Sequence, residues 1–289
     1  MNVRHIHKLW LTLAILIAVT FFIVSSLFAV PQVTELKKLT MTPRNLVLVK
    51  HCHHVPASHQ HEFVDESGSL KVLVWNIYKQ NRGDWSQGLN RFSQDATLLM
   101  LQEVADNDGF RHWLTNAGWQ GYQVAAFSYR DVDNGVLTAA KNKANDVCAF
   151  TSPEPWLRLP KSSLVTYHNL SDGRTLAVAN LHAINFSLGL QAYRQQLEQV
   201  QSILTKHQGP IIFAGDFNSW NGQREHVMKG VMQALSLNEV SFSHDVRKRF
   251  VTGYALDHIY YRGLKIEEAE VLSTTASDHN PLKVMFTLN

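Results

Sequence analysis

Phe-Ala-Gly-Asp-Phe-Asn at positions 213–218 is an apolar run that ends in an acid and an amide. Downstream, Leu-Asp-His-Ile at 256–259 and Ser-Asp-His-Asn-Pro at 277–281 place acids beside imidazoles. A β-strand that leaves the core at such a point aims its last polar groups into a cleft. We therefore expect a polar site built from strand ends. Three apolar runs upstream end in the same way, at 72–76, 98–103 and 178–182.

Two of these strand ends carry carboxylates, Glu103 and Asp216. A buried carboxylate without a partner is strongly disfavoured. The six blocks contain no Lys or Arg, and the bases at their strand ends are His182 and His279. Carboxylate and amide oxygens are hard ligands that suit Mg²⁺ or Mn²⁺ rather than Zn²⁺. The pattern therefore indicates a hydrated hard cation of the kind that assists phosphate chemistry.

The order of the six blocks carries a family resemblance. Trp-Asn, Gln-Glu, Leu-His, Gly-Asp-Phe-Asn, Leu-Asp-His and Ser-Asp-His-Asn-Pro follow one another here as they do in the endonuclease/exonuclease/phosphatase (deoxyribonuclease I-like) superfamily. One block would be a weak signal, but six in order are specific. The resemblance covers residues 70–289. Val-Trp-Asn-Ile-Tyr-Lys-Gln and the Asn-Phe-Ser-Leu-Gly after the central His resemble the YafD-type bacterial branch.

The resemblance implies a single Mg²⁺ ion, for which Mn²⁺ is a possible substitute. It makes Glu103 the principal metal ligand, with Asn76 beside it and Asp278 as an acid near the metal. Abasic-site enzymes of the family often carry a further acid two positions after the strand-end Asn. Tyr78 occupies that position here, so we expect no second metal contact.

The resemblance also implies catalytic roles. Asp216 and Asn218 match the pair that activates and orients the attacking water. His279 matches the histidine that contacts the scissile phosphate, and Asp257 matches the acid that orients its ring. A phosphodiester requires an in-line nucleophile, charge stabilisation on its equatorial oxygens and help for the leaving oxygen. These residue types can supply all three.

Two more residues follow from the same resemblance. His182 falls where relatives place a phosphate or leaving-group contact, and Asn185 matches a phosphate-contacting Asn; Asn76 is a further candidate for substrate binding. Taken singly, each candidate has a structural alternative. Asn76 could cap its own strand end, and Asp216 with Asn218 could form an Asx turn. The joint order favours the functional interpretation.

The sequence thus predicts a Mg²⁺-dependent phosphodiester hydrolase, with nucleic acid as the favoured substrate. The net charge of +3 does not itself indicate nucleic acid. The basic run 247–249 is a candidate contact to a phosphate backbone. The alternatives are a phospholipid or small-phosphoester hydrolase resembling a sphingomyelinase, and a non-catalytic scaffold. No protein partner is inferred, and a monomer is expected.

Apolar runs and helical periodicity predict an α/β (α+β) fold for residues 70–289. It is a four-layer αββα sandwich, in which helices flank two mixed sheets, with the site on strand-end loops. One long helix is expected over 188–207, because its apolar residues recur at helical spacing. Strands are expected at 71–75, 97–101, 122–127, 163–168, 175–181, 211–214, 258–261, 265–272 and 282–286.

The N-terminus predicts a hydrophobic anchor helix within residues 1–31. Leu9 to Val30 lacks charged residues and follows a basic start. As a helix with a rise of about 1.5 Å per residue it is long enough to span a bilayer. The expected location is the inner membrane, with the side of the catalytic domain undetermined, because basic residues lie on both sides of the span. A translation start at Met41 would instead give a cytoplasmic protein.

Residues 32–69 are expected to form a polar, His-rich linker. The histidines between His51 and His61, with Cys52, suggest a metal-binding tract, but their spacing lacks a paired frame, so a solvated tail is favoured. Cys52 and Cys148 provide no disulfide framework, which leaves the redox compartment open.

Overall fold

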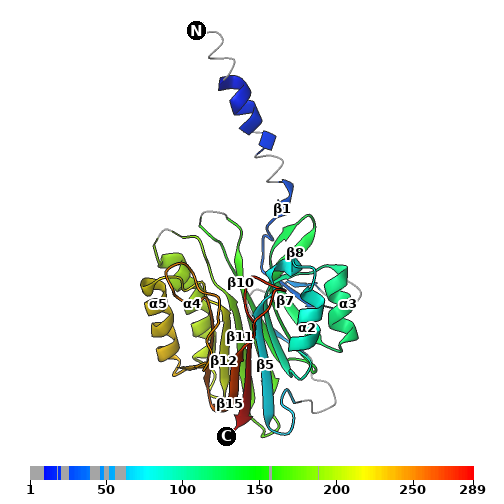
Figure 1. The fold of residues 1–289 in the computed structure, drawn as a ribbon, viewed down its shortest axis with the longest axis vertical. Coiled ribbons are helices and arrows are strands. Elements are labelled where there is room, and N and C mark those ends of the chain that lie inside the picture. Colours follow the sequence, from blue (N-terminus) through cyan, green and yellow to red (C-terminus); the bar gives the residue numbers. More distant parts are fainter. Residues whose placement is uncertain are drawn as a thin grey trace.

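The computed structural model describes residues 10–17, 19–20, 26–39, 46–48, 52–55, 63–155, 158–187 and 189–289. In these residues two β-sheets pack face to face, and helices cover the outer side of each sheet (Figure 1). The predicted αββα sandwich is therefore confirmed. The helices are α2 (Trp85–Phe92), α3 (Asp108–Asn116), α4 (Gln191–Leu204) and α5 (Gly222–Ala234), with the 3₁₀ turn η1 (Tyr78–Gln80).

The first sheet has the order β15-β16-β5-β6-β8-β7-β2-β3, and β1 pairs with β7. Its middle strands β5 and β6 run parallel, while β16 is antiparallel to β5. The strands are β1 (Phe28–Ala29), β2 (Glu35–Leu39), β3 (Leu46–Leu48), β5 (Ser69–Asn76), β6 (Leu98–Ala105), β7 (Gln120–Tyr129), β8 (Val132–Ala140), β15 (Leu264–Val271) and β16 (Leu282–Leu288).

The second sheet has the order β13-β14-β12-β11-β10-β9-β4. Strands β11 and β12 run parallel, and β14 is antiparallel to β12. Strands β8 and β9, one in each sheet, had not been predicted. The strands are β4 (Cys52–His54), β9 (Asp146–Ser152), β10 (Lys161–Asn169), β11 (Thr175–His182), β12 (Ile211–Asp216), β13 (Asn238–Glu239) and β14 (Asp257–Arg262).

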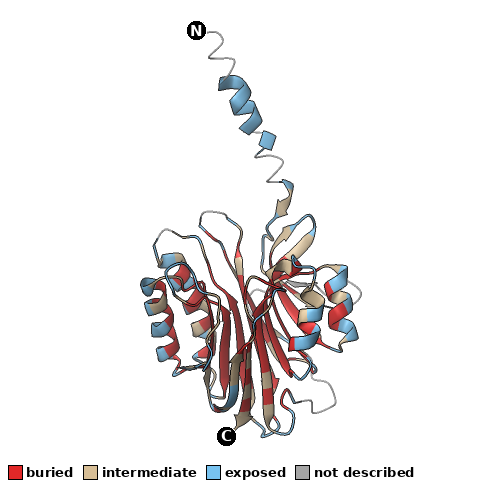
Figure 2. Cartoon of the chain, in the orientation of Figure 1, coloured by how far each residue is buried: buried red, intermediate tan, exposed pale blue. Residues whose placement is uncertain are grey.

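The central strands of both sheets are buried, as Figure 2 shows, and their core is formed by apolar side chains. Between the sheets, β5 and β6 meet β11, β12 and β14 through one apolar cluster that includes Val74, Met100 and Ile212. Helix α4 packs Tyr193 and Leu197 onto the outer face of the second sheet, as its periodicity predicted. Two-sided burial explains the nearly continuous apolar runs of these strands.

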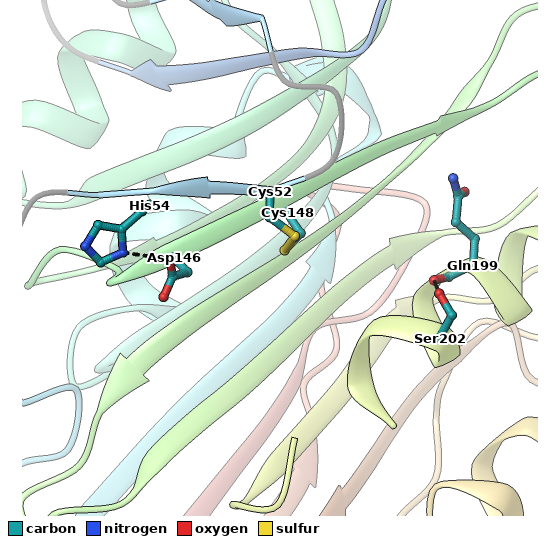
Figure 3. The surroundings of a disulfide bond; sticks show 6 residues. All are labelled: Cys52, His54, Asp146, Cys148, Gln199 and Ser202. Atoms are coloured by element: carbon teal, nitrogen blue, oxygen red, sulfur yellow. Dashed lines mark hydrogen bonds and ion pairs between the residues drawn. A yellow bond between two sulfur atoms is a disulfide. The ribbon is translucent and has the colours of Figure 1, made fainter. Parts of the chain in front are cut away.

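The segment predicted as a linker supplies strands to both sheets. β2 pairs with β7, and β4 pairs with β9, where Cys52 and Cys148 form a disulfide with an S–S distance of 2.01 Å (Figure 3). His54 Nδ1 lies 2.8 Å from Asp146 Oδ1. The expectation of a solvated tail was therefore wrong for residues 52–54. Two cysteines 96 residues apart give no sequence signal for pairing, because the fold brings them together.

The predicted anchor falls partly outside the described residues. Residues 10–17 and 19–20 are helical, whereas Phe28–Ala29 forms β1 and pairs with Tyr129–Ser128. Among the described residues, no helix has the length and apolarity needed to cross a membrane. Met41, His51, His59 and His61 also lie outside the described residues, so the alternative start and the metal tract stay predictions.

Candidate active site

The ends of neighbouring strands meet at one edge of the sandwich. In the second sheet Asp216 is in register with His182 on one side and with Asp257 on the other. From the facing sheet, Asn76 Nδ2 donates a hydrogen bond to Asp216 Oδ2 at 3.0 Å. All four side chains are buried. The structure thus brings these four predicted residues together around Asp216.

Asp257 and His279 form a buried pair, with Asp257 Oδ2 2.7 Å from His279 Nδ1. Trp75 Nε1 donates to the carbonyl oxygen of His279 at 2.9 Å, which fixes this loop to β5. Burial opposes protonation of the ring, but the charges of Asp257, Asp216 and Asp278 and the hydrogen bond with Asp257 raise the pKa of His279 to about 10. His279 is therefore an imidazolium at neutral pH.

Asp216 is the centre of this group. Burial raises the pKa of its carboxyl to about 6, although the charge of His279 opposes that rise. Its Oδ1 accepts a hydrogen bond from the backbone N–H of Asn218 at 3.0 Å. Gly215, at φ +139°, brings β12 close to β11, because a Cβ there would lie 2.0 Å from the carbonyl oxygen of Leu181. A side chain at position 215 would displace the adjoining carboxylate.

Asn218 occupies strained backbone at φ 45°. Its Nδ2 donates to the carbonyl oxygen of Ala183 at 2.9 Å, which ties the loop after β12 to the loop after β11. Strain of this kind persists only where the surroundings enforce it, and it concentrates at functional sites. Asn218 therefore holds two site loops in a fixed relation.

Glu103 reaches the site through a β-bulge. The register of β6 against β8 shifts between Leu101 and Val104, and Glu103 adopts φ 53°. A bulge redirects a side chain without ending the strand. The Glu103 carboxylate forms an ion pair with Lys79. Burial opposes ionisation, but His182, Lys79 and Lys161 lower the pKa of Glu103 to about 2.

His182 lies between the two acids. Its Nε2 is 3.7 Å from Glu103 Oε1 and 3.7 Å from Asp216 Oδ2. Burial, with the charge of Lys161, holds the pKa of His182 well below its ordinary value, so the ring is neutral. Lys161 Nζ donates to Nε2 at 3.1 Å. A lysine and a neutral imidazole therefore line this side of the site.

The loop after His182 is anchored by charged side chains that the sequence blocks did not contain. Glu154 Oε1 accepts hydrogen bonds from the backbone N–H groups of Asn185 at 2.7 Å and Phe186 at 2.6 Å. Arg224, buried in α5, donates to the carbonyl oxygens of residues 184 and 185 at 2.6 and 2.7 Å. The structure fixes the backbone of Asn185 in this way.

A cavity of about 150 Å³ opens beside Glu103 and His182. Lys79 and Lys161 give it cationic walls, and it is closed by apolar groups that include Phe186. The sequence pattern did not indicate these two lysines, because they lie outside the six blocks that end in acids, amides or imidazoles. Lys79 and Lys161 each lie near the end of a strand or turn, yet nothing in the local pattern marks them.

The donor set fits a hard cation. Asp216, Asp257 and His279 place ligand atoms within 4.8 Å of one another, and of these the two carboxylates offer lone pairs while the imidazolium of His279 does not. Asp278 Oδ1 is buried without a hydrogen-bond partner among the described residues. A buried carboxylate oxygen without a hydrogen-bond donor is an environment that a divalent cation relieves. Of the predicted ligands, Glu103 is paired with Lys79, and Asn76 with Asp216.

The basic run at 247–249 is largely neutralised by acids. Arg247 forms ion pairs with Asp245 at 2.9 Å and with Glu239 at 3.4 Å, and Arg249 Nη2 lies 2.5 Å from Asp245 Oδ2. His258 Nδ1 lies 2.6 Å from the same Glu239 carboxylate. Arg247 and Arg249 therefore stabilise the loop that precedes β14 and do not present free charge to a phosphate backbone.

Comparisons with known proteins agree with this arrangement. The model of the Endonuclease/Exonuclease/phosphatase family matches residues 73–279. A protein of Vibrio campbellii described as "UPF0294 protein" is 45% identical over 282 residues, which cover 98% of this chain and 98% of that protein.

Solved structures share the fold. An endonuclease/exonuclease/phosphatase from Bacteroides vulgatus superposes with a TM-score of 0.61 at 15% identity, covering 76% of this chain and 99% of that one. D. rerio TDP2 complexed with single-strand DNA product superposes with a TM-score of 0.56 at 15% identity, covering 76% of this chain and 99% of that one.

Proposed function

Because this chain belongs to the endonuclease/exonuclease/phosphatase family of hydrolytic phosphoesterases, we propose that it is a Mg²⁺-dependent phosphodiester hydrolase. The observation that carries the proposal is the buried line Asp257–His279–Asp216. Asp257 holds the imidazolium at 2.7 Å, and His279 Nε2 lies 3.9 Å from Asp216 Oδ2. That separation is too long for a direct hydrogen bond, so Nε2 of His279 and Oδ2 of Asp216 are each available to a phosphate or a water bound at the site.

Asp216 would act as the general base. A pKa of about 6 is close to working pH, which suits a group that must accept a proton from water and release it again. Hydrogen bonds from Asn76 Nδ2 and the backbone N–H of Asn218 fix the orientation of its carboxylate. The attacking water would therefore meet a base that is already oriented.

His279 and His182 would act on the phosphate itself. The imidazolium of His279 can donate from Nε2 to a non-bridging oxygen as negative charge develops there. Lys161, whose ammonium donates to Nε2 of neutral His182 at 3.1 Å, can donate a proton toward the leaving oxygen, and His182 holds that ammonium in position. Asn185 follows three residues later, on the loop that Glu154 and Arg224 anchor.

A divalent cation would be held by Glu103, Asn76 and Asp278, with Mn²⁺ able to replace Mg²⁺. When bound, such a cation neutralises phosphate charge. Lys79 now neutralises Glu103, so the ammonium must move aside for the carboxylate to serve as a ligand. The lysine would then face the adjacent cavity, which it already lines.

The class of molecule that carries the phosphodiester is a separate proposal. Nucleic acid is one candidate, supported by the likeness to a protein solved with a single-strand DNA product. Against it, Arg247 and Arg249 are paired with acids and offer little charge to a long backbone. A phospholipid or small phosphoester is the other candidate, and the compact cavity beside Glu103 favours a small group next to the phosphate.

We place the protein at the membrane through its N-terminal apolar segment, with the catalytic domain on the oxidising side. The second part of this proposal rests on the Cys52–Cys148 disulfide. Such bonds form and persist outside the reducing cytosol. A membrane-impermeant protease, added after the outer membrane is permeabilised, tests the location. It reaches only a domain that lies outside the inner membrane.

The experiment that tests the function incubates the full chain with Mg²⁺ or EDTA and plasmid DNA, single-stranded DNA, RNA, phospholipid vesicles and inositol phosphates. Asp216→Asn is run in parallel. Asp172→Asn is the matched control, because Asp172 pairs with Arg174 in an exposed turn between β10 and β11. Metal-dependent cleavage that is lost in Asp216→Asn and kept in Asp172→Asn supports the proposal. Equal cleavage by all three chains contradicts it.

A further inference from the structure

Exposed apolar side chains gather at the end of the sandwich that carries the site. Four of them lie on loops or hairpins there and define the site-end rim: Tyr129, Phe186, Phe250 and Val251, with exposed fractions of 38%, 54%, 44% and 93%. Val30 and Val33 are also exposed next to this end. Phe63, 42% exposed, lies at the opposite end, beside the last residue of β10. Large exposed apolar side chains on several loops at one end of a domain are a candidate interaction surface.

The rim borders the catalytic residues directly. Phe186 is four residues after His182 and lines the cavity beside Glu103. The ring of Phe250 packs at 5.6 Å against Trp220, which is two residues after Asn218. A surface that covers Phe186 therefore also covers the cavity beside Glu103.

The N-terminal segment leaves the sandwich at this same end (Figure 1). Phe28 begins β1 and packs against Tyr129 of the rim at a ring distance of 5.0 Å. The backbone N–H of Arg130 donates to the carbonyl oxygen of Leu27 at 2.9 Å. The uncharged segment before this strand covers positions 9–27, and a helix of that length is about 28 Å long. A helix of that length would span a bilayer with few residues left over as a spacer before β1.

Charge at the rim suits a lipid surface. Arg130 lies over the ring of Tyr129 at 5.3 Å, and Lys248 lies two residues before Phe250. Aromatic rings flanked by Lys or Arg are typical of the bilayer interface, where rings enter the headgroup layer and cations meet anionic lipid. In the N-terminal helix, apolar side chains such as Trp10 and Leu16 are exposed by 65% and 61%.

We propose that the site-end rim rests on the bilayer that holds the N-terminal segment, and that the substrate is the phosphodiester of a lipid headgroup presented at that surface. The inference rests on the proposed hydrolase function and names its substrate class. With Phe28 paired with Tyr129 and few residues left as a spacer before it, a bilayer that holds the segment would lie close to the end of β7. The site at the same end then faces lipid.

Depth-dependent quenching tests the docking. The full chain is reconstituted into vesicles of phosphatidylethanolamine and phosphatidylglycerol that contain spin-labelled lipid, and a fluorophore is attached at Val251→Cys or, as a control, at Lys265→Cys. The two native cysteines are paired in the disulfide and do not compete for the label. Lys265 is exposed and lies on β15 of the first sheet, where its register with Thr287 and Ser69 puts it at the end of the sandwich opposite to the site. Headgroup-labelled lipid should quench position 251 severalfold more than position 265. Equal quenching overturns the proposal.

Turnover separates the inference from the function on which it rests. Phe250→Ser/Val251→Ser should lower hydrolysis of vesicle phospholipid about tenfold, because apolar area no longer enters the bilayer. Hydrolysis of soluble bis(4-nitrophenyl) phosphate should stay within about twofold. Phe63→Ser is the matched control and should change neither rate. If no chain hydrolyses the soluble ester, the proposed function fails. If the soluble ester and nucleic acid are cleaved but vesicle lipid is not, the function stands and this inference is overturned.

Discussion

Arg224→Met tests whether the loop after His182 must be held in place for turnover. The Arg224 guanidinium donates to the carbonyl oxygens of Ile184 at 2.6 Å, Asn185 at 2.7 Å and Asn218 at 3.0 Å, and to Ser187 Oγ at 3.0 Å. It thereby joins the loop that carries Asn185 to the loop that carries Asn218. Methionine keeps much of the volume and removes every donor.

The cost follows from these contacts. Three backbone carbonyls lose a charged donor, and each such loss destabilises by about 1 kcal/mol net. The guanidinium also stacks on Tyr193 at 4.6 Å and on Trp220 at 4.7 Å, and each contact contributes about 0.5 to 1 kcal/mol. Together these terms predict a loss of about 4 kcal/mol in the free energy of unfolding. A shift of about 1 Å in the released loops would lower kcat about 100-fold.

Urea unfolding and steady-state kinetics on bis(4-nitrophenyl) phosphate, at a temperature where the variant stays folded, measure the two effects. Arg262→Met is the matched control. Arg262 also donates to backbone carbonyls, those of Leu235 at 2.8 Å, Gly209 at 3.4 Å and His207, but at the other end of β14. It should lower stability and leave kcat within about twofold of the wild type. Arg224→Lys, which keeps the charge and part of the bonding, should recover part of kcat. A folded Arg224→Met protein with wild-type kcat would refute the positioning role.

Asp257→Asn should lower the pKa of His279 from about 10 toward its ordinary value, because it removes the main negative charge that stabilises the imidazolium. NMR titration of the ring protons measures this pKa, and an unchanged value would contradict the assignment. Glu239→Gln should reduce stability at pH 7 by about 1 to 2 kcal/mol, discounted because the carboxylate is partly exposed. Burial raises the pKa of Glu239, but His258 and Arg247 lower it to about 2, so its contribution to stability is complete above pH 4.5 and disappears as pH falls through 2. Urea unfolding should show that the difference in unfolding free energy between wild type and variant is smaller near pH 2 than at pH 7. A difference that is the same at both pH values would refute this role. Cys52→Ser/Cys148→Ser should cost about 2 to 4 kcal/mol in unfolding free energy and leave kcat unchanged, whereas a large loss of kcat would show that β4 supports the site.

The strands that border the site could be predicted because they are buried on both faces. β5, β11 and β12 read as continuous apolar runs that stop at Asn76, His182 and Asp216, and the structure places all three ends at one edge. The family resemblance supplied the order of these ends, and the registry of β11, β12 and β14 accounts for their proximity. The catalytic roles assigned to the residues stay predictions.

Other features depended on tertiary contacts that leave no local pattern. Strand β6 was expected to end at Leu101, but a bulge carries it to Ala105 and turns Glu103 toward the site. Strand β8 escaped prediction because polar and small residues interrupt its alternation. Gly135 at its centre is required by packing, since a Cβ there would lie 1.8 Å from the carbonyl oxygen of Val124.

The charged partners of the site were the least predictable part. Lys79, Lys161 and Arg224 come from a turn, a strand start and a helix, and only the folded chain shows which groups they contact. Burial and electrostatic pairing select such residues through three-dimensional distance rather than sequence spacing. The disulfide between Cys52 and Cys148 belongs to the same class of feature.

The hydrolysis rate of bis(4-nitrophenyl) phosphate during a Mg²⁺ titration, measured for the wild-type full chain and for Asp216→Asn side by side, tests the central claim most directly. The wild-type rate should rise to saturation with Mg²⁺ and return to background in EDTA. Asp216→Asn should stay at background at every concentration, because its amide cannot accept the proton of the attacking water. A wild-type rate that persists in EDTA, or an Asp216→Asn rate that follows the wild-type curve, would contradict a metal-dependent hydrolase built around Asp216.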